Sequence, residues 1–235
     1  MTTFPRLFVD AGLAPEAEVT ATAAQAHYLL HVMRRTPGDP VLLFNGRDGE
    51  WRALLTAPRR NATVLRVEMQ SRPQAAEPDL WLAFALLKRD ATDLVVQKAT
   101  ELGASALIPL MTDRTVAGRV NQHRLLAIAV EAAEQSERLT VPAVQLPRRF
   151  GDVLDAWPAE RPLFAAIERA SLTGVPPATG AAGLMVGPEG GFTPAELDAL
   201  GRRPFVTPVS LGPRILRAET ACLAGLALLQ APRCG

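Results

Sequence analysis

Two short segments in the C-terminal part of the chain hold the residues whose types and spacing could do chemistry. The first, residues 187–191, reads Gly-Pro-Glu-Gly-Gly and follows a short apolar run. Glycines let the backbone turn sharply and let a ligand come close to the main chain. Thr193, Pro194 and Glu196 then form a helix start signal, a capping box with proline at the first helical position. Ligands of open α/β sheets bind at the carboxyl ends of parallel strands, so the pattern indicates a ligand-binding loop, with a plain tight turn as the alternative.

The second segment, residues 211–220, reads Leu-Gly-Pro-Arg-Ile-Leu-Arg-Ala-Glu-Thr, and it also leaves a predicted strand and opens a predicted helix. Its Gly-Pro pair makes a rigid turn. Arg214 and Arg217 then stand at the helix N-terminus, where positive charge opposes the helix dipole. An arginine pair that helix stability does not favour indicates a function. Two surface arginines that pair with Glu219 are the alternative.

Other catalytic patterns are missing from the sequence. His27 and His31 lie four residues apart, a spacing that can hold a metal, but no acidic residue or cysteine beside them completes a ligand set. The glycine spacing of residues 187–191 matches neither the dinucleotide-binding fingerprint nor the phosphate-binding P-loop. Serine, histidine and aspartate form no recognisable nucleophile elbow. We therefore expect no metal site.

The composition is that of a globular protein. The chain has 235 residues, 48% of them hydrophobic and 21% charged, which fits one or two domains with a substantial core. No apolar run approaches the roughly 18 residues that a membrane span needs, and the N-terminus lacks the pattern of a signal peptide. Only two cysteines, Cys222 and Cys234, are present, which fits a reducing compartment. We expect a cytoplasmic protein with no membrane partner.

The basic residues are unusual in type. Arginine supplies 23 of the 25 basic residues, and the two lysines are Lys88 and Lys98. A GC-rich genome would produce this bias, but arginine is also the better residue for planar contacts to phosphate. Between residues 34 and 72 there are eight arginines and four acidic residues. The mildly basic N-terminal part therefore suggests a polyanionic partner.

The N-terminal third has the pattern of a small β-barrel. Strands are predicted at residues 40–44, 50–55 and 61–69, with the turn dipeptides Asn-Gly and Asp-Gly after the first strand and a helix at 22–34. Several short strands within about 70 residues are typical of a barrel. We place this domain at residues 1–72 and a polar, proline-bearing linker at residues 73–78.

From residue 79 to residue 235, predicted strands alternate with predicted helices. The strands are expected at residues 80–87, 106–110, 163–167, 183–186 and 206–211. The helices are expected at residues 90–102, 122–138 and 215–230, and a further helix begins after Thr193. This alternation predicts an α/β domain with a largely parallel sheet.

Taken together, in this order and near the C-terminus, the two glycine-bearing segments resemble the SPOUT superfamily of RNA methyltransferases. The match is closest to the RsmE family, whose signature resembles residues 187–192 and 211–221. The resemblance runs over almost the whole chain. Its further matching segments are Lys88-Arg89, residues 97–103, Pro109-Leu110, residues 131–138, and His27 with residues 32–34 and 38–39.

The resemblance implies a fold, a cofactor and partners. The implied fold is α/β, with a SPOUT-type C-terminal domain that carries a trefoil knot and a small PUA-like N-terminal β-barrel that binds RNA. The resemblance also implies a homodimer, S-adenosylmethionine (SAM) as methyl donor, and no metal. The implied reaction methylates N3 of a uridine in the 16S rRNA of the small ribosomal subunit, the uridine numbered 1498 in the conventional scheme, to give 3-methyluridine. Two alternatives stay open: a SPOUT methyltransferase that acts on another RNA nucleoside, and a non-catalytic RNA-binding factor of ribosome assembly.

Roles for individual residues follow. The cofactor-binding residues implied by the resemblance are Leu110, Gly187, Pro188, Glu189, Gly190, Gly191, Leu211, Gly212, Ile215 and Leu216. Because N3 of uracil is a poor nucleophile until it loses its proton, positive charge near the uracil oxygens would lower the cost of deprotonation. We assign Arg217 to the uracil and Arg214 as a second candidate, while Glu219 either takes the proton or orients an arginine. Arg6 and Arg34 are the candidates for contacts with the RNA backbone.

Overall fold

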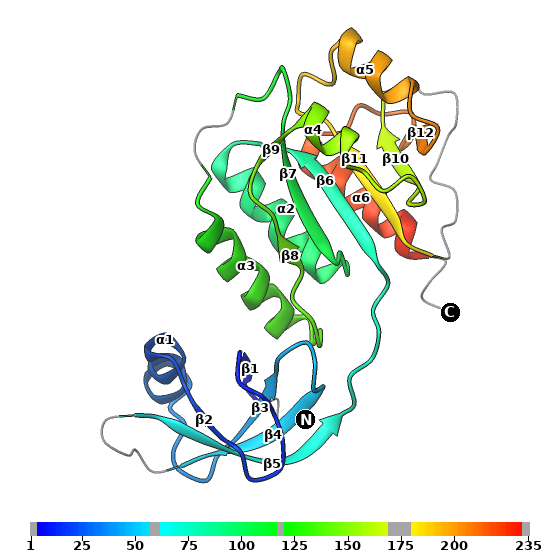
Figure 1. Cartoon of the computed structure of the whole chain (residues 1–235). Coiled ribbons are helices and arrows are strands. Elements are labelled where there is room, and N and C mark those ends of the chain that lie inside the picture. The colour runs from blue at the N-terminus through cyan, green and yellow to red at the C-terminus, as the bar shows by residue number, and fades with distance from the viewer. Residues whose placement is uncertain (1–3, 57–61, 117–119, 169–179, 232–235) are drawn as a thin grey trace. The chain divides into compact units, whose positions relative to one another are not determined.

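The computed structural model describes residues 4–56, 62–116, 120–168 and 180–231, and Cys234 lies outside them. The chain forms two compact units (Figure 1). The N-terminal unit consists of residues 1–76 and 133–141, and the C-terminal unit consists of residues 77–132 and 142–235. The predicted linker at residues 73–78 spans the point where the chain first passes from one unit to the other. In the described part of the chain, no helix has the length and apolar character to cross a membrane.

The N-terminal unit is built on one five-stranded sheet in the order β1-β3-β4-β5-β2. Its strands are β1 (Arg6–Phe8), β2 (Glu18–Thr20), β3 (Pro40–Phe44), β4 (Glu50–Leu55) and β5 (Val64–Arg72). The β1/β3 pair is parallel, and the other pairs are antiparallel. The predicted barrel is confirmed as a curled sheet, a half-barrel with β1 and β2 at its two edges.

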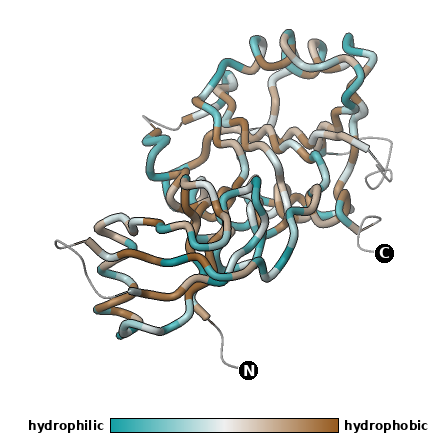
Figure 2. Tube along the Cα trace, turned by 60° about the horizontal axis from the view of Figure 1, so that its bottom comes forward, coloured by the Kyte–Doolittle hydropathy of each residue, from teal (hydrophilic) through white to brown (hydrophobic). Residues whose placement is uncertain are grey.

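Alternating burial along the strands gives this sheet its core. Val41 and Leu43 on β3, and Leu65 and Val67 on β5, are fully buried, and the residues between them are mostly more exposed. Figure 2 shows hydrophobic and hydrophilic stretches following one another along the Cα trace. The two edge strands escaped prediction because three residues are too few to show an alternating pattern.

The predicted helix at residues 22–34 is shorter and changes type along its length. It begins with α1 (Ala23–His27), capped by Thr22 in a capping box, and continues as a π-helix over Tyr28–Val32. The amide of Met33 donates to the carbonyl of Tyr28, the wider spacing that defines a π-turn. Arg34 follows with φ at +52°, a left-handed conformation that is uncommon for a residue other than glycine.

Arg6 forms the centre of a buried polar cluster in the N-terminal unit. Its Nε donates to Glu50 at 2.7 Å, and its terminal nitrogens donate to the carbonyls of Ala133, Glu134 and Arg138 at 2.8–3.0 Å. The guanidinium thereby satisfies carbonyls at the C-terminal end of a helix, which have no partners within the helix itself. We therefore assign Arg6 to this cluster and no longer to the RNA-binding surface.

The C-terminal unit contains a seven-stranded sheet in which all the pairs are parallel. The order is β12-β10-β11-β6-β7-β8, and β9 also pairs with β7. The strands are β6 (Leu80–Ala85), β7 (Ala106–Met111), β8 (Ala143–Val144), β9 (Arg148–Arg149), β10 (Leu163–Ala166), β11 (Ala182–Val186) and β12 (Val206–Val209). The predicted α/β class with a parallel sheet is therefore confirmed.

Helices cover both faces of this sheet (Figure 1), so its central strands read as continuous apolar runs. The helices are α2 (Arg89–Glu101), α3 (Gln122–Gln135), α4 (Phe150–Asp155), α5 (Pro194–Gly201) and α6 (Ala218–Gln230). On one face, α6 packs against α2 and against β6 and β11. On the other face, Phe150 and Leu154 of α4 and Leu200 of α5 share a core with Ile108 and Met185.

The last strand and the last helix are both shorter than predicted. β12 ends at Val209, although the predicted strand ran to residue 211. The helix α6 begins at Ala218, with Arg217 as its N-cap, although the prediction started it at residue 215. Gly212, with φ at +123°, and Pro213 direct the chain away from regular structure. Residues 210–217 therefore form a longer loop than the sequence pattern indicated.

The Arg6 cluster generates a test of stability. Burial by itself raises the pKa of Glu50, but hydrogen bonds from Arg72, Arg6 and Ser71 outweigh it and hold the pKa below its ordinary value. The variant Glu50→Gln leaves the buried Arg6 without its counter-charge, so we expect it to lose about 3 kcal/mol of unfolding free energy at pH 7. Urea unfolding followed by circular dichroism measures this loss.

The same pair predicts a pH dependence. A lowered pKa in the folded state stabilises the fold above the unfolded pKa of about 4.3, and this contribution disappears as the pH falls through the folded value. The difference between wild type and Glu50→Gln should therefore shrink below about pH 4. Glu68→Gln is the control, since its partner Arg52 is much more exposed. Equal losses in the two variants would contradict a special role for Glu50.

Candidate functional site

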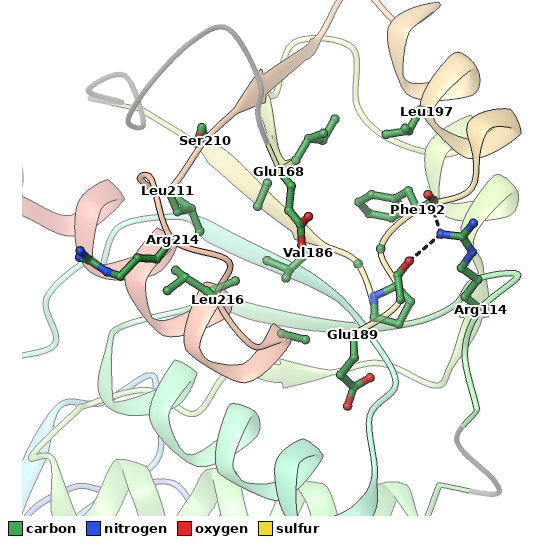
Figure 3. A pocket seen from close by; sticks show the side chains of 18 of the residues that line it. Arg114, Glu168, Val186, Glu189, Phe192, Leu197, Ser210, Leu211, Arg214 and Leu216 are labelled. Atoms are coloured by element: carbon green, nitrogen blue, oxygen red, sulfur yellow. Dashed lines mark hydrogen bonds between the residues drawn. The ribbon is translucent and has the colours of Figure 1, made fainter.

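A pocket opens at the carboxyl ends of β10, β11 and β12 (Figure 3), and its volume is about 390 Å³. The segment after β11, residues 187–192, forms one side, and the segment after β12, residues 210–216, forms the other. Both glycine-bearing segments that the sequence singled out therefore meet at one place. The volume lies within the range of about 300–1,000 Å³ that is usual for small-molecule sites.

The first loop has a fixed backbone shape. The amide of Gly191 donates to the carbonyl of Pro188 at 2.8 Å, which closes a turn, and Gly191 has φ at +68°. The ring of Phe192 folds back over Gly187, where a Cβ atom would lie only 3.2 Å from the ring. At Gly187 the glycine serves close packing, and at Gly191 it serves the left-handed conformation.

Arg114, in the turn after β7, holds this loop from outside. One terminal nitrogen donates to the carbonyl of Gly190 at 2.6 Å and more weakly to that of Phe192 at 3.4 Å (Figure 3). The side-chain stem of Arg114 also packs on Gly190, since a Cβ atom there would lie 3.3 Å from its Cδ. Arg114 is not recognisable from the sequence, because nothing in the local pattern shows which loop the end of β7 faces.

A buried carboxylate ties the same turn to the start of α5. Glu196 is only 5% exposed, and it accepts hydrogen bonds from the amides of Thr193 and Asp113 at 2.8 and 3.0 Å. The hydroxyl of Thr193 lies 3.2 Å from the carboxylate of Asp113. The capping box predicted from the sequence is present, and its glutamate also joins two segments that are far apart in the chain.

The second loop is more open than the first. The hydroxyl of Ser210 lies within 3.2–3.4 Å of the carbonyl and the amide of Gly212, which shapes the turn after β12. Leu211 and Leu216 give the pocket apolar walls, and Arg214 also lines it. In Figure 3 the guanidinium of Arg214 points away from the space between the loops.

The structure places most of the predicted cofactor residues at this pocket. Those that line it are Gly187, Pro188, Glu189, Gly190, Gly191, Leu211, Gly212 and Leu216. Leu110 is fully buried inside the sheet and does not line the pocket. Ile215 points outward, with 71% of its surface exposed. The structure therefore does not bring Leu110 and Ile215 to the pocket, whereas Leu211 and Leu216 line it.

The three residues predicted to act on the substrate lie close together in the sequence, just before and at the start of α6, and Arg214 is the one of the three that lines the pocket. Arg217 stands between the lining residues Leu216 and Ala218. Glu219 follows in the first turn of α6. The shorter helix places Arg214 in the loop before α6 and Arg217 at its N-cap, and both residues are exposed.

The lining residues also include Ser210 and Glu168, which the sequence analysis did not select. Glu168 follows β10, and no glycine-rich segment comes directly after that strand. The sequence pattern that indicated the other two loops as binding loops is therefore missing here. Cys222 lies close by on α6, and its burial, reinforced by the charge of Glu219, raises the pKa of its thiol well above the ordinary value. A thiol of this kind is inert at neutral pH.

Within the described ranges, no three histidine, cysteine or acidic residues come together as metal ligands do. The pocket is lined by main-chain groups of the two glycine-bearing loops, by apolar side chains and by a few charged residues. This set suits a ligand that is bound by backbone hydrogen bonds and apolar contacts, as an adenosine group would be.

Comparisons with known proteins agree with this site. The model of the RNA methyltransferase domain matches residues 75–230, and that of the RNA methyltransferase PUA domain matches residues 21–68. The chain is similar to the ribosomal RNA small subunit methyltransferase E of Rickettsia conorii, with 34% identity over 95% of this chain and 94% of that relative. The Synechocystis protein of the same name is 37% identical over 96% of this chain and 77% of that protein.

A solved structure extends the similarity to three dimensions. The ribosomal RNA small subunit methyltransferase E from Neisseria gonorrhoeae, determined with bound S-adenosylmethionine, superposes with a TM-score of 0.89 at 29% identity and 98% coverage of both chains. The family models match both parts of the chain, and the two relatives are more than 30% identical to it over nearly its full length. These matches agree on one protein family. The chain belongs to the ribosomal RNA small subunit methyltransferase E family, which is the RsmE family whose signature its two glycine-bearing segments resemble.

Proposed function

We propose that this chain transfers the methyl group of SAM to N3 of a uridine in 16S rRNA, giving 3-methyluridine. One observation carries the proposal: both glycine-bearing loops line a single pocket, at the carboxyl ends of two parallel strands that flank β10, in a chain of this family. The family relative from Neisseria gonorrhoeae was solved with SAM bound, which supports the choice of cofactor.

The residues of the pocket fit SAM. Main-chain groups of residues 187–191 and 211–216 can supply the one donor and one acceptor that the edge of adenine requires, and Leu211 and Leu216 offer apolar surface to its ring. The sulfonium of SAM is an activated methyl donor when bound. The protein therefore needs mainly to hold donor and acceptor in line, which a loop fixed by Arg114 and Phe192 can do.

The acceptor nitrogen sets the harder requirement. N3 of uracil must lose its proton, and negative charge then spreads to the uracil oxygens. We assign Arg217 to the stabilisation of that charge, with Arg214, which lines the pocket, as the second candidate; both residues are exposed and can reach a substrate. Glu219 either takes the proton or orients an arginine. Because N3 lies on the pairing edge of the base, the uridine has to be unpaired or flipped out before it enters the site.

The N-terminal unit is the proposed RNA-binding module, since most of its strands lie in the part that matches a PUA domain. Arg34 is exposed, and it stands just after the π-helix in a left-handed conformation. Such conformations are held at a cost and cluster at functional sites. Arg34 is therefore our candidate for a contact with the RNA backbone, and binding through it should weaken as salt concentration rises.

Three further properties rest on the family resemblance and belong to the same proposal. They are a trefoil knot in the C-terminal unit, a homodimer with each cofactor site beside the subunit interface, and a cytoplasmic location in contact with the small ribosomal subunit.

The reaction can be tested directly. Purified protein is incubated with methyl-labelled SAM and unmodified small ribosomal subunits, and the RNA is digested so that the labelled nucleoside can be identified by mass and retention. We expect label in 3-methyluridine at one site of 16S rRNA. Label in another nucleoside would sink the target assignment, and neither label nor SAM binding would favour a non-catalytic assembly factor.

The proposed role of Arg217 predicts a loss in rate with little loss in cofactor binding. Arg217→Ala removes a positive charge that acts on the uracil anion, so we expect single-turnover methylation to slow by about 100-fold or more. The Kd for SAM should stay within about twofold. Arg202→Ala, which removes an exposed arginine at the end of α5, serves as the control. A rate for Arg217→Ala equal to that of the control would remove Arg217 from the mechanism.

The contacts of Arg114 predict the opposite pattern. Arg114→Met keeps an aliphatic stem on Gly190 but removes the hydrogen bonds to the loop, so we expect SAM to bind about 5- to 10-fold more weakly. The methylation rate at saturating SAM should change little. Arg148→Met is the matched control, because Arg148 also donates to a backbone carbonyl, that of Asp152, but outside the pocket. Unchanged SAM affinity in Arg114→Met would show that the loop holds its shape without this arginine.

A further inference from the structure

Glu168 stands at a special position in the strand order of the C-terminal unit. β10 lies between β11 and β12, and Ala166 is in register with Val186 on one side and Val209 on the other. The amide of Ile167 still donates to the carbonyl of Val209 at 2.9 Å. Glu168 is therefore the first residue after the part of the chain that is hydrogen-bonded to β11 or β12. At this position the chain passes out of the sheet between the two loops that form the pocket.

The side chain of Glu168 occupies the space that this position opens. Glu168 lines the pocket, and in Figure 3 its carboxylate extends from the end of β10 toward Val186, between the two loops. Among the residues that the structure describes, none donates a hydrogen bond to this carboxylate. Its negative charge is thus available to a ligand in the pocket.

The other charged groups of the pocket do not share this placement. Arg114 uses its guanidinium on the carbonyls of Gly190 and Phe192. The side chains of Glu189 and Arg214 point away from the space between the loops in Figure 3. Of the charged lining residues in the described part of the chain, Glu168 alone is aimed into that space.

The walls around Glu168 strengthen any charge interaction that it makes. Glu168 itself is exposed in this structure. Ala166, Val186, Leu211 and Leu216 beside it are apolar, so a ligand that packs against them displaces water from around the carboxylate and strengthens the attraction between the two charges. SAM carries two positive groups, the sulfonium at the reacting centre and the ammonium of its methionine part. A carboxylate at the centre of the pocket complements either of them.

We propose that Glu168 binds a positive group of SAM, its sulfonium or its ammonium, and so raises the affinity of the pocket for SAM over an uncharged thioether such as 5′-methylthioadenosine. This inference rests on the proposed function and adds a residue to it that neither the sequence pattern nor the resemblance assigned. Methyl transfer converts the sulfonium to a neutral thioether, so S-adenosylhomocysteine (SAH) keeps only the ammonium. A contact with the sulfonium would therefore hold the donor more tightly than the product and favour product release.

The test is a ligand series measured by titration calorimetry on the full chain. SAM carries both positive groups, SAH carries the ammonium alone, and 5′-methylthioadenosine carries neither. For Glu168→Gln we expect SAM to bind about tenfold more weakly than to wild type, and 5′-methylthioadenosine to bind within about twofold. Weakening of SAM alone supports a contact with the sulfonium. Similar weakening of SAM and SAH supports a contact with the ammonium.

Two further variants separate charge from structure. Glu168→Asp keeps the charge on a shorter side chain and should restore part of the SAM affinity that Glu168→Gln loses. Glu160→Gln removes an exposed carboxylate at the opposite end of β10, outside the pocket, and should leave all three affinities unchanged. Equal weakening of the three ligands, or unchanged SAM affinity in Glu168→Gln, would overturn the inference while the proposed function stands. Failure of the wild-type chain to bind SAM would overturn both.

Discussion

The parallel order of three neighbouring strands, β12-β10-β11, is the constraint on which the site depends. Parallel strands deliver their carboxyl ends to the same edge, so the segments after all three must converge there. Two of those segments carry glycines, which let main-chain groups face a ligand. The third places Glu168 between them. Pocket walls, loop spacing and the central carboxylate thus all follow from the pairing of the strands.

The features that the sequence predicts well are those with local causes. The capping box at Thr193 and Glu196 forms as expected, because both partners lie within one helical turn. Gly103 ends α2 with φ at +76°, as a helix-terminating glycine should. The hairpin between β3 and β4 forms around the predicted turn dipeptides. Alternation of strands and helices was enough to predict a parallel sheet.

The features that escaped prediction depend on contacts between distant residues. Arg114 lies 76 positions from the glycine whose carbonyl it holds, and Arg6 lies 127 or more from the helix end that it caps. The start of α6 was predicted too early because the run of leucine, isoleucine and arginine after Pro213 has helical propensity, whereas the site requires an extended loop there. The local preference of residues 215–217 for a helix is overridden by the loop geometry that the pocket requires, as is expected at a functional site.

Arginine shows why composition alone cannot separate structural from functional residues. Arg6 and Arg161 are both 8% exposed and bound on several sides, Arg6 by Glu50 and by backbone carbonyls, Arg161 by Asp79 and by the ring of Trp81. These guanidiniums hold the fold, because leaving such a charge buried without its partners would be costly. Arg34 and Arg217, by contrast, are exposed and stand where the backbone departs from regular structure. Arginines of this chain therefore fall into two groups: buried arginines with several partners, which stabilise the fold, and exposed arginines, which include the two that we propose for contacts with the RNA.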